Sequence, residues 1–418
     1  MKKMIYDRLT GRETSLAVIG LGYVGVPVAL RFARCFDVVG YDMDARRIEK
    51  LREKYGAGCG SIRFTSLEEE LSRAAFYIVT VLTPVDERKN PDLTCLVEAT
   101  RTVARYLKRG DYVVYESTVY PGCTEEVCVP LLEKGSGLKL GADFKVGYSP
   151  ERINPNDSEH TFSNTAKIVS ANDGQALDEV ARVYAEVVAA DLCRASGIRV
   201  AKMTENVQRS VNIALMNELQ RLFSRMGIDM GEVIDMASSK WNFVKYRPGL
   251  GGGHCIPVDP LYLVSAASKL GVEMPVTSSG CAVNDGMAAY VVRSLLGAMG
   301  SDGRGARALL MGVTYKENID DIRNSRIAEM VGLLEREGMS VDVTDPHADP
   351  DKVYAMYGIR PVPALRPPYD LIVVAVAHDE YRGLDDAYFR SISRGAALLG
   401  DIRGLYKGRI KSLGYWSL

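Results

Sequence analysis

Short apolar runs alternate with helical patterns in two parts of this chain, and one long helical pattern lies between those parts. In the first part, the apolar runs have the length of β-strands and occupy residues 15–20, 37–41, 76–84, 112–122 and 144–152. The alternation returns after residue 301, with apolar runs at residues 307–316, 340–345, 370–378 and 397–403. Strands that alternate with helices predict mainly parallel sheets with helices on both faces. The pattern therefore predicts an α/β protein with two Rossmann-like, doubly wound domains.

The middle pattern covers residues 200–227, which is longer than an average helix, and Gly227 is a suitable stop. Three asparagines interrupt it, namely Asn206, Asn212 and Asn217. Asparagine is a poor residue for a helix interior, so their presence indicates polar contacts on a buried face. A long apolar helix of this kind is also a candidate dimer seam. We therefore predict a central helical domain, and three domains in total with the boundaries 1–197, 198–300 and 301–418.

A glycine motif, Gly20-Leu-Gly22-Tyr-Val-Gly25, follows the first apolar run and precedes a helical pattern. A lone G-x-G-x-x-G is weak evidence, but a strand before it and a helix after it are the context of a dinucleotide-binding loop. In such a loop the first glycine makes the turn, the second lets the backbone reach a pyrophosphate, and the third lets helix and strand pack closely. The pyrophosphate lies at the helix N-terminus, where free N–H groups favour negative charge. Tyr23 and Val24 complete the predicted cofactor loop.

An acidic residue, Asp42, ends the second apolar run at about the 20-residue spacing found in dinucleotide-binding domains. A carboxylate there accepts hydrogen bonds from the adenosine ribose and repels a 2′-phosphate, so we expect NAD rather than NADP. Arg46 and Arg47 follow closely and are the residues that would favour NADP. An ordinary turn residue after a strand is the alternative interpretation of Asp42.

Polar residues stand at three later strand ends, where ligands bind in open α/β sheets. They are Thr83 with Pro84, Ser117 with Thr118, and Glu151 with Arg152. Each alone has an alternative explanation as a cap or turn residue. On the predicted long helix, Lys202 and Asn206 are four residues apart and therefore share one face. Two solvated polar residues on an amphipathic helix are the alternative there.

Three consecutive glycines, Gly251, Gly252 and Gly253, stand close before Cys255. Glycine costs backbone entropy on folding, so such a run indicates a backbone that takes up positive φ or closely approaches another group. The alternative is a flexible turn beside a buried cysteine, but we favour a nucleophilic thiol in a tight loop. Asp259 precedes a proline at a predicted helix start, so it is a helix cap, a catalytic carboxylate or both.

Composition excludes several classes of protein. With 52 Lys and Arg against 53 Asp and Glu, the net charge of -1 gives no basic surface for nucleic acid. No stretch approaches the roughly 20 apolar residues of a membrane span, and residues 1–7 lack the apolar core of a signal peptide. The eight cysteines form no C-x-x-C pair, so we predict no metal site and expect reduced thiols in a cytoplasmic protein.

Six motifs occur in order along the chain: Gly20–Gly25, Ser117–Gly122, Ser149–Asn154, Lys202-x-x-x-Asn206, Gly252–Asp259 and Asp320–Ser325. With these motifs the chain resembles the UDP-glucose/GDP-mannose dehydrogenase family along nearly its whole length. That family oxidises the C6 hydroxyl of a nucleotide sugar to a carboxylate with two NAD+. Residues 115–126, 148–155, 240–243 and 247–250 are similar to the branch that acts on UDP-N-acetylhexosamines such as UDP-GlcNAc or UDP-GalNAc, for capsule and O-antigen precursors. UDP-glucose and UDP-ManNAc are the alternative substrates.

The resemblance implies an NAD-binding first domain, a nucleotide-sugar-binding last domain and a homodimer through the central helix. Around the nucleophile Cys255 it places Thr118, Glu151, Lys202, Asn206 and Asp259. On the cofactor side we expect Thr83, Pro84, Ser117 and Thr118 in addition to the glycine motif and Asp42, with Arg323 near NAD. On the nucleotide-sugar side we expect Glu151, Arg152, Lys202, Asn206, Arg247, Gly251, Gly252, Gly253, Lys316 and Arg403. Arginine, lysine and backbone N–H groups suit a diphosphate.

A thiolate suits this chemistry because a primary alcohol needs two hydride transfers to become an acid. Capture of the intermediate aldehyde as a thiohemiacetal prevents its escape, and the second hydride transfer then gives a thioester that water cleaves. His254 stands beside Cys255, but neighbours in an extended loop usually point to opposite sides, so it is left out of the predicted site. Two features depart from the family pattern: Leu82 replaces the usual proline, and the segment between Arg47 and Phe76 is shortened.

Two other functions compete with this one. The β-hydroxyacid dehydrogenases share a Rossmann domain, a long helix and a Lys-x-x-x-Asn pair, but they transfer one hydride and need no cysteine. The loop of Cys255 and the second α/β domain argue against them. A catalytically silent homologue that only binds nucleotide sugar is the more remote alternative. The presence of Lys202, Asn206, Cys255 and Asp259 together argues against it.

Overall fold

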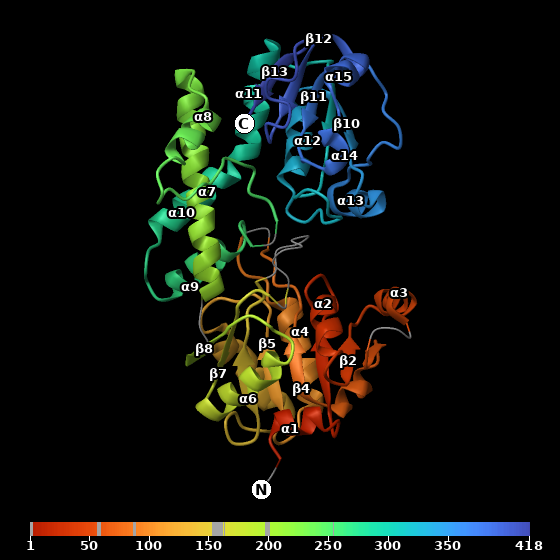
Figure 1. Ribbon diagram of the computed structural model, residues 1–418, viewed down its shortest axis with the longest axis vertical. Helices are drawn as coiled ribbons and strands as arrows, with labels where there is room; N and C mark the ends of the chain where they lie inside the picture. The colour runs from red at the N-terminus through yellow and green to blue at the C-terminus, as the bar shows by residue number, and fades with distance from the viewer. Residues whose placement is uncertain are drawn as a thin grey trace. The chain divides into compact units, whose positions relative to one another are not determined.

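The computed structural model describes residues 3–56, 60–86, 89–152, 162, 164–196, 201–253 and 255–418 (Figure 1). The chain divides into two compact units, and each is described by itself. The first unit comprises Met1–Glu205 and Leu261–Val272, and the second comprises Asn206–Pro260 and Glu273–Leu418. The predicted division into three domains stays a prediction, and its first boundary, at residue 197, lies outside the described residues.

Among the described residues of the first unit, the centre is an eight-stranded sheet in the order β3-β2-β1-β4-β5-β6-β7-β8. Its strands are β1 (Ser15–Ile19), β2 (Val38–Tyr41), β3 (Ile62–Thr65), β4 (Ala74–Val79), β5 (Tyr112–Tyr115), β6 (Lys145–Tyr148), β7 (Lys167–Ala171) and β8 (Leu192–Ser196). The first six strands are mutually parallel, β7 is antiparallel to β6, and β8 is parallel to β7. The predicted strands match β1, β2, β4, β5 and β6, whereas β3, β7 and β8 were not predicted.

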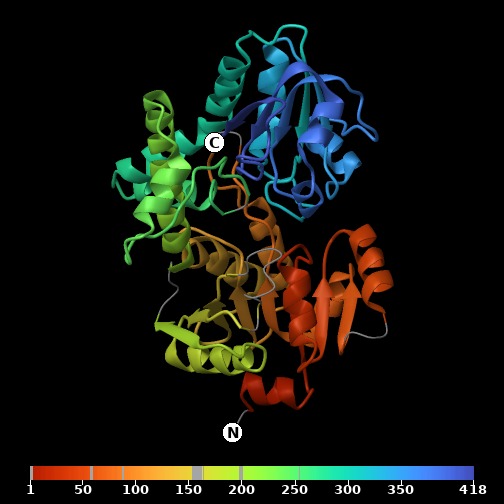
Figure 2. The ribbon, with the colours of Figure 1, turned by 45° about the horizontal axis from the view of Figure 1, so that its top comes forward.

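Helices cover both faces of this sheet, as Figure 2 shows. One face carries α1 (Ile5–Thr10), α2 (Gly25–Phe32) and α6 (Gly174–Ala185). Alternate strand residues such as Leu16, Val18 and Phe76 point to that face and pack with Phe32 and Tyr184. The other face carries α4 (Thr94–Tyr106), whose neighbour is α5 (Val129–Ser136). The hydroxyl of Tyr115, from β5, bonds Thr100 of α4 there at 3.0 Å.

The smaller elements of the first unit complete its edges. They are α3 (Ala45–Tyr55), the 3₁₀ turn η2 (Glu68–Arg73), the π-helical turn η3 (Thr124–Cys128) and α9 (Asp259–Lys269), of which Asp259 and Pro260 belong to the second unit. The shortened segment that follows Arg47 is therefore α3, β3 and η2. Within the unit, α9 is held because the Tyr262 hydroxyl donates to the Pro84 carbonyl at 2.9 Å.

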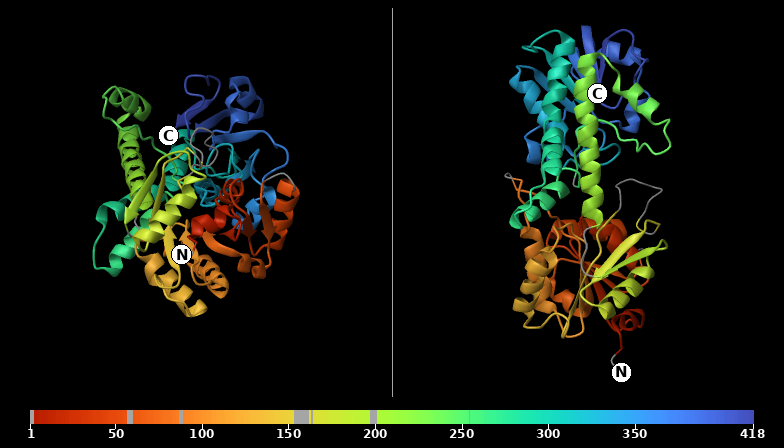
Figure 3. Two further views of the ribbon diagram at one scale, coloured as in Figure 1. Left: turned by 60° about the horizontal axis from the view of Figure 1, so that its bottom comes forward. Right: turned by 90° about the vertical axis from the view of Figure 1, so that its left-hand side faces the viewer.

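The long helix α7 (Ala201–Met226) confirms the central helical pattern, and Figure 3 shows it as one uninterrupted helix. It ends as predicted at Gly227, whose φ of 70° is left-handed. Its residues Ala201–Glu205 belong to the first unit and the rest to the second. In the second unit α7 packs against α8 (Met230–Ala237) through a small core that includes Met216, Met230 and Ile234.

The sheet of the second unit is five-stranded and parallel, in the order β10-β9-β11-β12-β13. Its strands are β9 (Arg307–Met311), β10 (Ser340–Thr344), β11 (Tyr369–Val374), β12 (Ser393–Asp401) and β13 (Gly414–Ser417). The helices after α8 and α9 are α10 (Pro275–Asp285), α11 (Met287–Met299), α12 (Arg326–Arg336), α13 (Pro350–Tyr357), α14 (Asp379–Arg382) and α15 (Asp386–Ile392). One face of the sheet packs against α11 and α12, and the other packs against α14 and α15. The predicted fold class, with two doubly wound α/β layers and a long helix, is confirmed.

Among the described residues, no helix combines the length and the apolar character that crossing a membrane requires.

Candidate active site

The glycine loop after β1 has the geometry of a dinucleotide-binding turn. Gly20 has φ of 90°, and Gly25 starts α2 where an added Cβ would lie 1.9 Å from the Gly20 carbonyl oxygen. At Gly22, in contrast, an added Cβ would meet no atom within 4 Å. The Thr80 hydroxyl donates to the Gly20 carbonyl at 2.7 Å and fixes the loop to β4. The loop thus offers open backbone at its middle glycine and a helix N-terminus behind it, which fits a bound pyrophosphate.

Asp42, directly after β2, braces this loop. One carboxylate oxygen accepts from the Leu21 N–H at 2.9 Å, and the other accepts from the Asp44 N–H at 3.0 Å. Arg47 donates to the same carboxylate at 3.1 Å. Because Arg47 is paired with Asp42, its guanidinium is not available to bind the 2′-phosphate of NADP.

The remaining predicted cofactor residues of the first unit lie at the ends of β4 and β5. Ser117 donates its hydroxyl proton to the Val81 carbonyl at 2.7 Å, which ties the two strand ends together. Thr83 is half-buried, and Pro84 is exposed. Tyr23, in the glycine loop, is also exposed.

Lys202 reaches the end of β5 from the first turn of α7. Its Nζ donates to the Thr118 hydroxyl oxygen at 3.0 Å, so the structure brings these two predicted residues together. Arg152 holds the same turn, because its guanidinium pairs with Glu205 at 2.8 Å and bonds the Ala166 carbonyl at 2.8 Å. Arg152 therefore makes structural contacts at the position where we expected a substrate contact.

Glu151 lies in a buried cluster that the sequence did not reveal. Its carboxylate accepts from the Nζ of Lys167 at 2.7 Å, and that ammonium also contacts Glu116 at 3.0 Å. Burial raises the pKa of Glu116 to about 7, although Lys167 and the Tyr184 hydroxyl act in the opposite direction. A signal for Glu116 existed, since it directly follows an apolar strand and precedes the Ser117-Thr118 pair.

The glycines before Cys255 have both features that their density predicted. Gly251 and Gly253 have φ of 65° and 99°. A Cβ on Gly253 would lie 2.8 Å from the ring of Tyr315, and one on Gly252 would lie 3.1 Å from the Asn324 carbonyl oxygen. The Asn324 amide also donates to the Gly253 carbonyl at 3.1 Å. The loop is therefore packed tightly, which contradicts the alternative of a flexible turn.

Cys255 is half-buried and stands one turn before α9. Its carbonyl accepts from the Asp259 N–H at 2.9 Å, in a turn that leads directly into α9. Asp259 is the first residue of α9 and not the cap before it. The Asp259 carboxylate is nearly fully buried and accepts from the Asn206 amide at 2.6 Å. The second unit thus brings together Asn206, Asp259 and the loop of Cys255.

Asn217, one of the three asparagines of α7, anchors the other end of this loop. Its amide accepts from the Gly249 N–H at 2.9 Å and donates to the Gly249 carbonyl at 3.1 Å. It also donates to Asn284 of α10 at 2.9 Å. Asn212, in contrast, bonds the Gln208 carbonyl of its own helix. Polar contacts on a buried face are therefore confirmed for Asn206 and Asn217 but not for Asn212.

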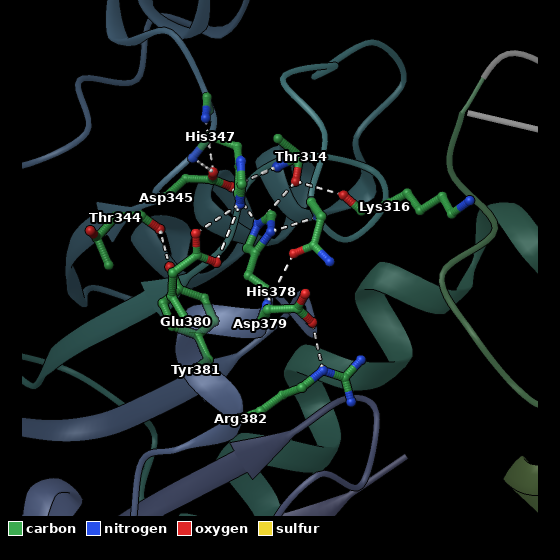
Figure 4. A network of polar contacts seen from close by, with 12 residues as sticks. Thr314, Lys316, Thr344, Asp345, His347, His378, Asp379, Glu380, Tyr381 and Arg382 are labelled. Atoms are coloured by element: carbon green, nitrogen blue, oxygen red, sulfur yellow. Dashed lines mark hydrogen bonds and ion pairs between the residues drawn. The ribbon is translucent and has the colours of Figure 1, made fainter. Parts of the chain in front are cut away.

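The loop after β9 carries Lys316 and is held by a buried histidine, as Figure 4 shows. The Nδ1 of His378 accepts from the Asn318 N–H at 3.0 Å, and its Nε2 lies 3.2 Å from Asp345. Asp345 also accepts from the N–H groups of Val313 and Thr314. Figure 4 shows the side chain of Lys316 extending away from the His378 ring. This network shapes the backbone beneath Lys316.

Electrostatics in this network favour an ionised Asp345. Burial acts to raise the pKa of Asp345, but hydrogen bonds from His378 and from backbone N–H groups hold it well below its usual range. His347, His378 and Glu380 place candidate metal-ligand atoms within 4.8 Å of one another. Because both ring nitrogens of His378 already contact the protein, we interpret this group as structural and not as a metal site.

Three predicted arginines lie elsewhere in the second unit. Arg323 makes a two-point pair with Asp321 at 3.0 and 2.6 Å. Arg247 contacts Asp235 at 3.3 Å, and Arg403 is exposed directly after β12. His254 lies outside the described residues, as does the end of the Ser149–Asn154 motif.

We predict that Gly253→Ala lowers the free energy of unfolding of the second unit by about 2–4 kcal/mol. Alanine would have to take up the left-handed backbone conformation of Gly253, and its Cβ would overlap the Tyr315 ring. Urea unfolding followed by tryptophan fluorescence measures this free energy of unfolding, because Trp241 and Trp416 both belong to the second unit. The matched control is Gly249→Ala, where an added Cβ meets no atom within 4 Å. Equal midpoints for the two variants would contradict the packing described for Gly253.

Three models of the UDP-glucose/GDP-mannose dehydrogenase family match the chain in order. The NAD binding domain matches residues 14–188, the central domain matches residues 198–286, and the UDP binding domain matches residues 309–408. UDP-N-acetyl-D-glucosamine 6-dehydrogenase of Pseudomonas aeruginosa is 44% identical over 94% of this chain and 97% of its own length. Protein CapL of Staphylococcus aureus is 41% identical over 94% of this chain and 96% of its own length.

Among solved structures, that of UDP-D-ManNAc dehydrogenase from Pyrococcus horikoshii superposes with a TM-score of 0.87 at 28% identity. The alignment covers 96% of this chain and 98% of that one. The NAD predicted from Gly20–Gly25 and Asp42 agrees with the matched NAD binding domain. The chain belongs to the UDP-glucose/GDP-mannose dehydrogenase family and is an oxidoreductase that uses NAD and acts on a nucleotide sugar.

Proposed function

We propose that this enzyme oxidises the C6 hydroxyl of a UDP-N-acetylhexosamine, UDP-GlcNAc or UDP-GalNAc, to the carboxylate with two NAD+. The observation that carries the proposal is the tightly packed loop that presents Cys255 beside Asp259 and Asn206. The choice of sugar is supported by the 44% identity to a UDP-N-acetyl-D-glucosamine 6-dehydrogenase, against 31% for the UDP-N-acetyl-D-mannosamine dehydrogenase of Pyrococcus horikoshii. UDP-glucose and UDP-ManNAc are the alternative substrates.

The chemistry requires four electrons to leave C6 without release of the aldehyde. NAD, when bound, accepts one hydride in each of the two oxidations. The thiolate of Cys255 adds to the aldehyde carbon and forms a thiohemiacetal, which the second oxidation converts to a thioester. Water then attacks the thioester carbonyl, the C–S bond breaks, and the Cys255 thiolate leaves. The sum is one alcohol, two NAD+ and one water converted to one carboxylate, two NADH and three protons.

The residues around this reaction divide into charge stabilisers and proton acceptors. Lys202, oriented by Thr118, supplies a positive charge for the oxygen at C6 as it develops negative charge. Asp259 and Glu151 are the carboxylates that take protons from alcohol, thiol or water. Cys255 precedes a helix N-terminus, which favours the thiolate. The Asn206 amide holds Asp259 in place.

The diphosphate of the substrate requires donors that the second unit can supply. Lys316 and Arg403 stand beyond the carboxyl ends of β9 and β12, and Gly251–Gly253 add backbone N–H groups. We propose that these groups, with Arg247, hold the nucleotide sugar, and that Arg323 lies near NAD. Arg152 is retained as a candidate contact, although its pair with Glu205 must then rearrange.

We also propose that the enzyme is a homodimer joined through α7. Apolar side chains at helical spacing are exposed on α7: Leu215 is 47%, Leu222 is 53% and Met226 is 60% exposed. An exposed apolar stripe of this kind is typical of a protein interface. A thiol nucleophile requires a reducing compartment, so we place the enzyme in the cytoplasm. We further propose, from the family resemblance, that the product is a precursor of surface polysaccharide.

The test of the function is the number of NADH formed per sugar consumed, with a panel of UDP-GlcNAc, UDP-GalNAc, UDP-ManNAc, UDP-glucose and GDP-mannose. We expect two NADH per sugar with an N-acetylated UDP-hexosamine. Cys255→Ser should lower kcat by at least about 100-fold because the aldehyde is no longer captured as a thiohemiacetal. One NADH per sugar, or full turnover by Cys255→Ser, would show that the covalent route is wrong. No turnover with any sugar would favour the silent binding protein.

We predict that Asp42→Asn raises the KM for NAD+ by about 10–100-fold while the KM for NADP+ stays the same or falls. The physical reason is that the variant loses a charged acceptor for the ribose hydroxyls and releases Arg47. Steady-state kinetics with both cofactors measure the change. Asp37→Asn, at the opposite end of β2, is the matched control because Asp37 pairs with Arg12 instead. Unchanged discrimination between the cofactors in Asp42→Asn would exclude a ribose contact.

We predict that Leu222→Glu converts the dimer to a monomer, because a carboxylate would have to be buried in the α7 interface. Size-exclusion chromatography with light scattering gives the mass directly. The matched control is Leu67→Glu, since Leu67 is 60% exposed but belongs to the first unit and is not part of α7. A wild-type monomer, or a dimer in both variants, would refute the α7 interface.

A further inference from the structure

A buried lysine lies between two carboxylates in the first unit. The Nζ of Lys167 donates to Glu151 at 2.7 Å and to Glu116 at 3.0 Å, and the three side chains are 3%, 6% and 0% exposed. The Tyr184 hydroxyl donates to the other oxygen of Glu116 at 2.5 Å. The ring centres of Phe162 and Tyr184 lie 4.7 and 5.8 Å from the same ammonium. The proposed reaction uses Glu151 but gives no role to Lys167 or Glu116.

The topology of the sheet explains why these side chains meet. Glu116 follows the end of β5, and Glu151 follows the end of β6. Lys167 is the first residue of β7, so in an all-parallel sheet it would lie at the opposite edge. Because β7 is antiparallel to β6, with Tyr148 beside Ser170, its first residue lies at the carboxyl edge, where ligands bind in such sheets.

The contacts favour an ionised and immobile Glu151. One oxygen accepts from Lys167, and the other accepts from the Arg152 N–H at 2.8 Å. Burial acts to lower the pKa of Lys167, but the carboxylates of Glu116 and Glu151 outweigh it and raise this pKa, so the ammonium stays charged. Removing one partner of a buried pair leaves the other charge uncompensated, which is strongly unfavourable.

We propose that Lys167, held in turn by Glu116 and Tyr184, is the positioning residue for Glu151 in hydrolysis of the thioester. This inference rests on the proposed function, in which Glu151 takes a proton from the attacking water. The water oxygen bonds to the thioester carbon, its proton goes to Glu151, and the Cys255 thiolate leaves. Lys167 exchanges no proton or bond in this step. It keeps the Glu151 carboxylate charged and pointed in one direction.

The test compares Lys167→Met, Lys167→Arg and the matched control Lys145→Met. Lys145 also pairs with a carboxylate of the same sheet, Asp173 at 2.7 Å, but it stands at the start of β6. For Lys167→Met we expect a burst of two NADH per site followed by a kcat lowered about 100-fold, with the KM values for sugar and NAD+ lowered in parallel. The ratio kcat/KM for the sugar should stay within about 2-fold of wild type, because hydrolysis comes after thioester formation. The intact mass of quenched protein should show the nucleotide-uronyl group on Cys255.

Two further measurements distinguish a positioning role of Lys167 from a merely structural one: recovery of kcat by Lys167→Arg, and the combined effect of substitutions at Lys167 and Glu151. Lys167→Arg should recover about 10-fold of the lost kcat, and Lys145→Met should keep the wild-type kcat. In the background of Glu151→Gln, replacing Lys167 should cost less than about 2-fold, because the residue acts through Glu151. Losses that multiply in the double variant, or slow turnover without acylated protein, would overturn the proposal. If Lys167→Met does not fold, the same cycle with Lys167→Arg decides the question.

The wild-type stoichiometry distinguishes failure of this inference from failure of the proposed function. One NADH per sugar in the wild type would overturn the four-electron reaction and the role of Lys167 in it. Two NADH per sugar, together with independent effects of the substitutions at Lys167 and Glu151, would overturn the role of Lys167 alone.

Discussion

The fixed backbone of residues 249–253, which precede Cys255, is the constraint on which the proposed chemistry depends. Glycine-rich backbone has high conformational entropy in the unfolded chain, so it is ordered only where contacts offset that loss. Here the Asn217 amide holds Gly249 by two hydrogen bonds, and Asn324 and the Tyr315 ring hold Gly253. Cys255, the proposed nucleophile, therefore follows a segment whose two ends are held by side chains.

Buried charged groups are held in the same way, because their hydrogen-bond and ion-pair partners come from segments that are distant in the sequence. In the first unit the antiparallel strand β7 carries Lys167 to the carboxyl edge of β5 and β6, where it neutralises Glu151. In the second unit His378, beyond β11, and Asp345, beyond β10, together fill the turn beneath Lys316. In each case a group proposed to act on substrate is held by a partner that has no substrate contact assigned.

The sequence predicted those features that depend on local patterns. Three such features are the motif Gly20–Gly25, the α7 pattern with its stop at Gly227, and the glycines before Cys255. In each of them neighbouring residues determine the turn, the helical period or the space that the backbone needs. It did not predict β7 or Lys167, because a strand's direction depends on pairing with a segment far away in the chain. Asp259 was misplaced by one position, because it is the first residue of α9 and is preceded by a turn that its N–H and the Cys255 carbonyl close.

The two carboxylates proposed to accept protons are held in different ways, and this difference assigns them to different steps. Asp259 accepts from a neutral amide, Asn206, which orients a carboxylate without neutralising it. Glu151 accepts from the Lys167 ammonium and from the Arg152 N–H, so both of its oxygens are held in a fixed direction. A carboxylate of fixed direction suits the attack of water on a thioester, because the water oxygen must be aligned with the carbonyl carbon while its proton is removed. The contacts therefore favour Glu151 in hydrolysis and Asp259, with Lys202, in the earlier steps.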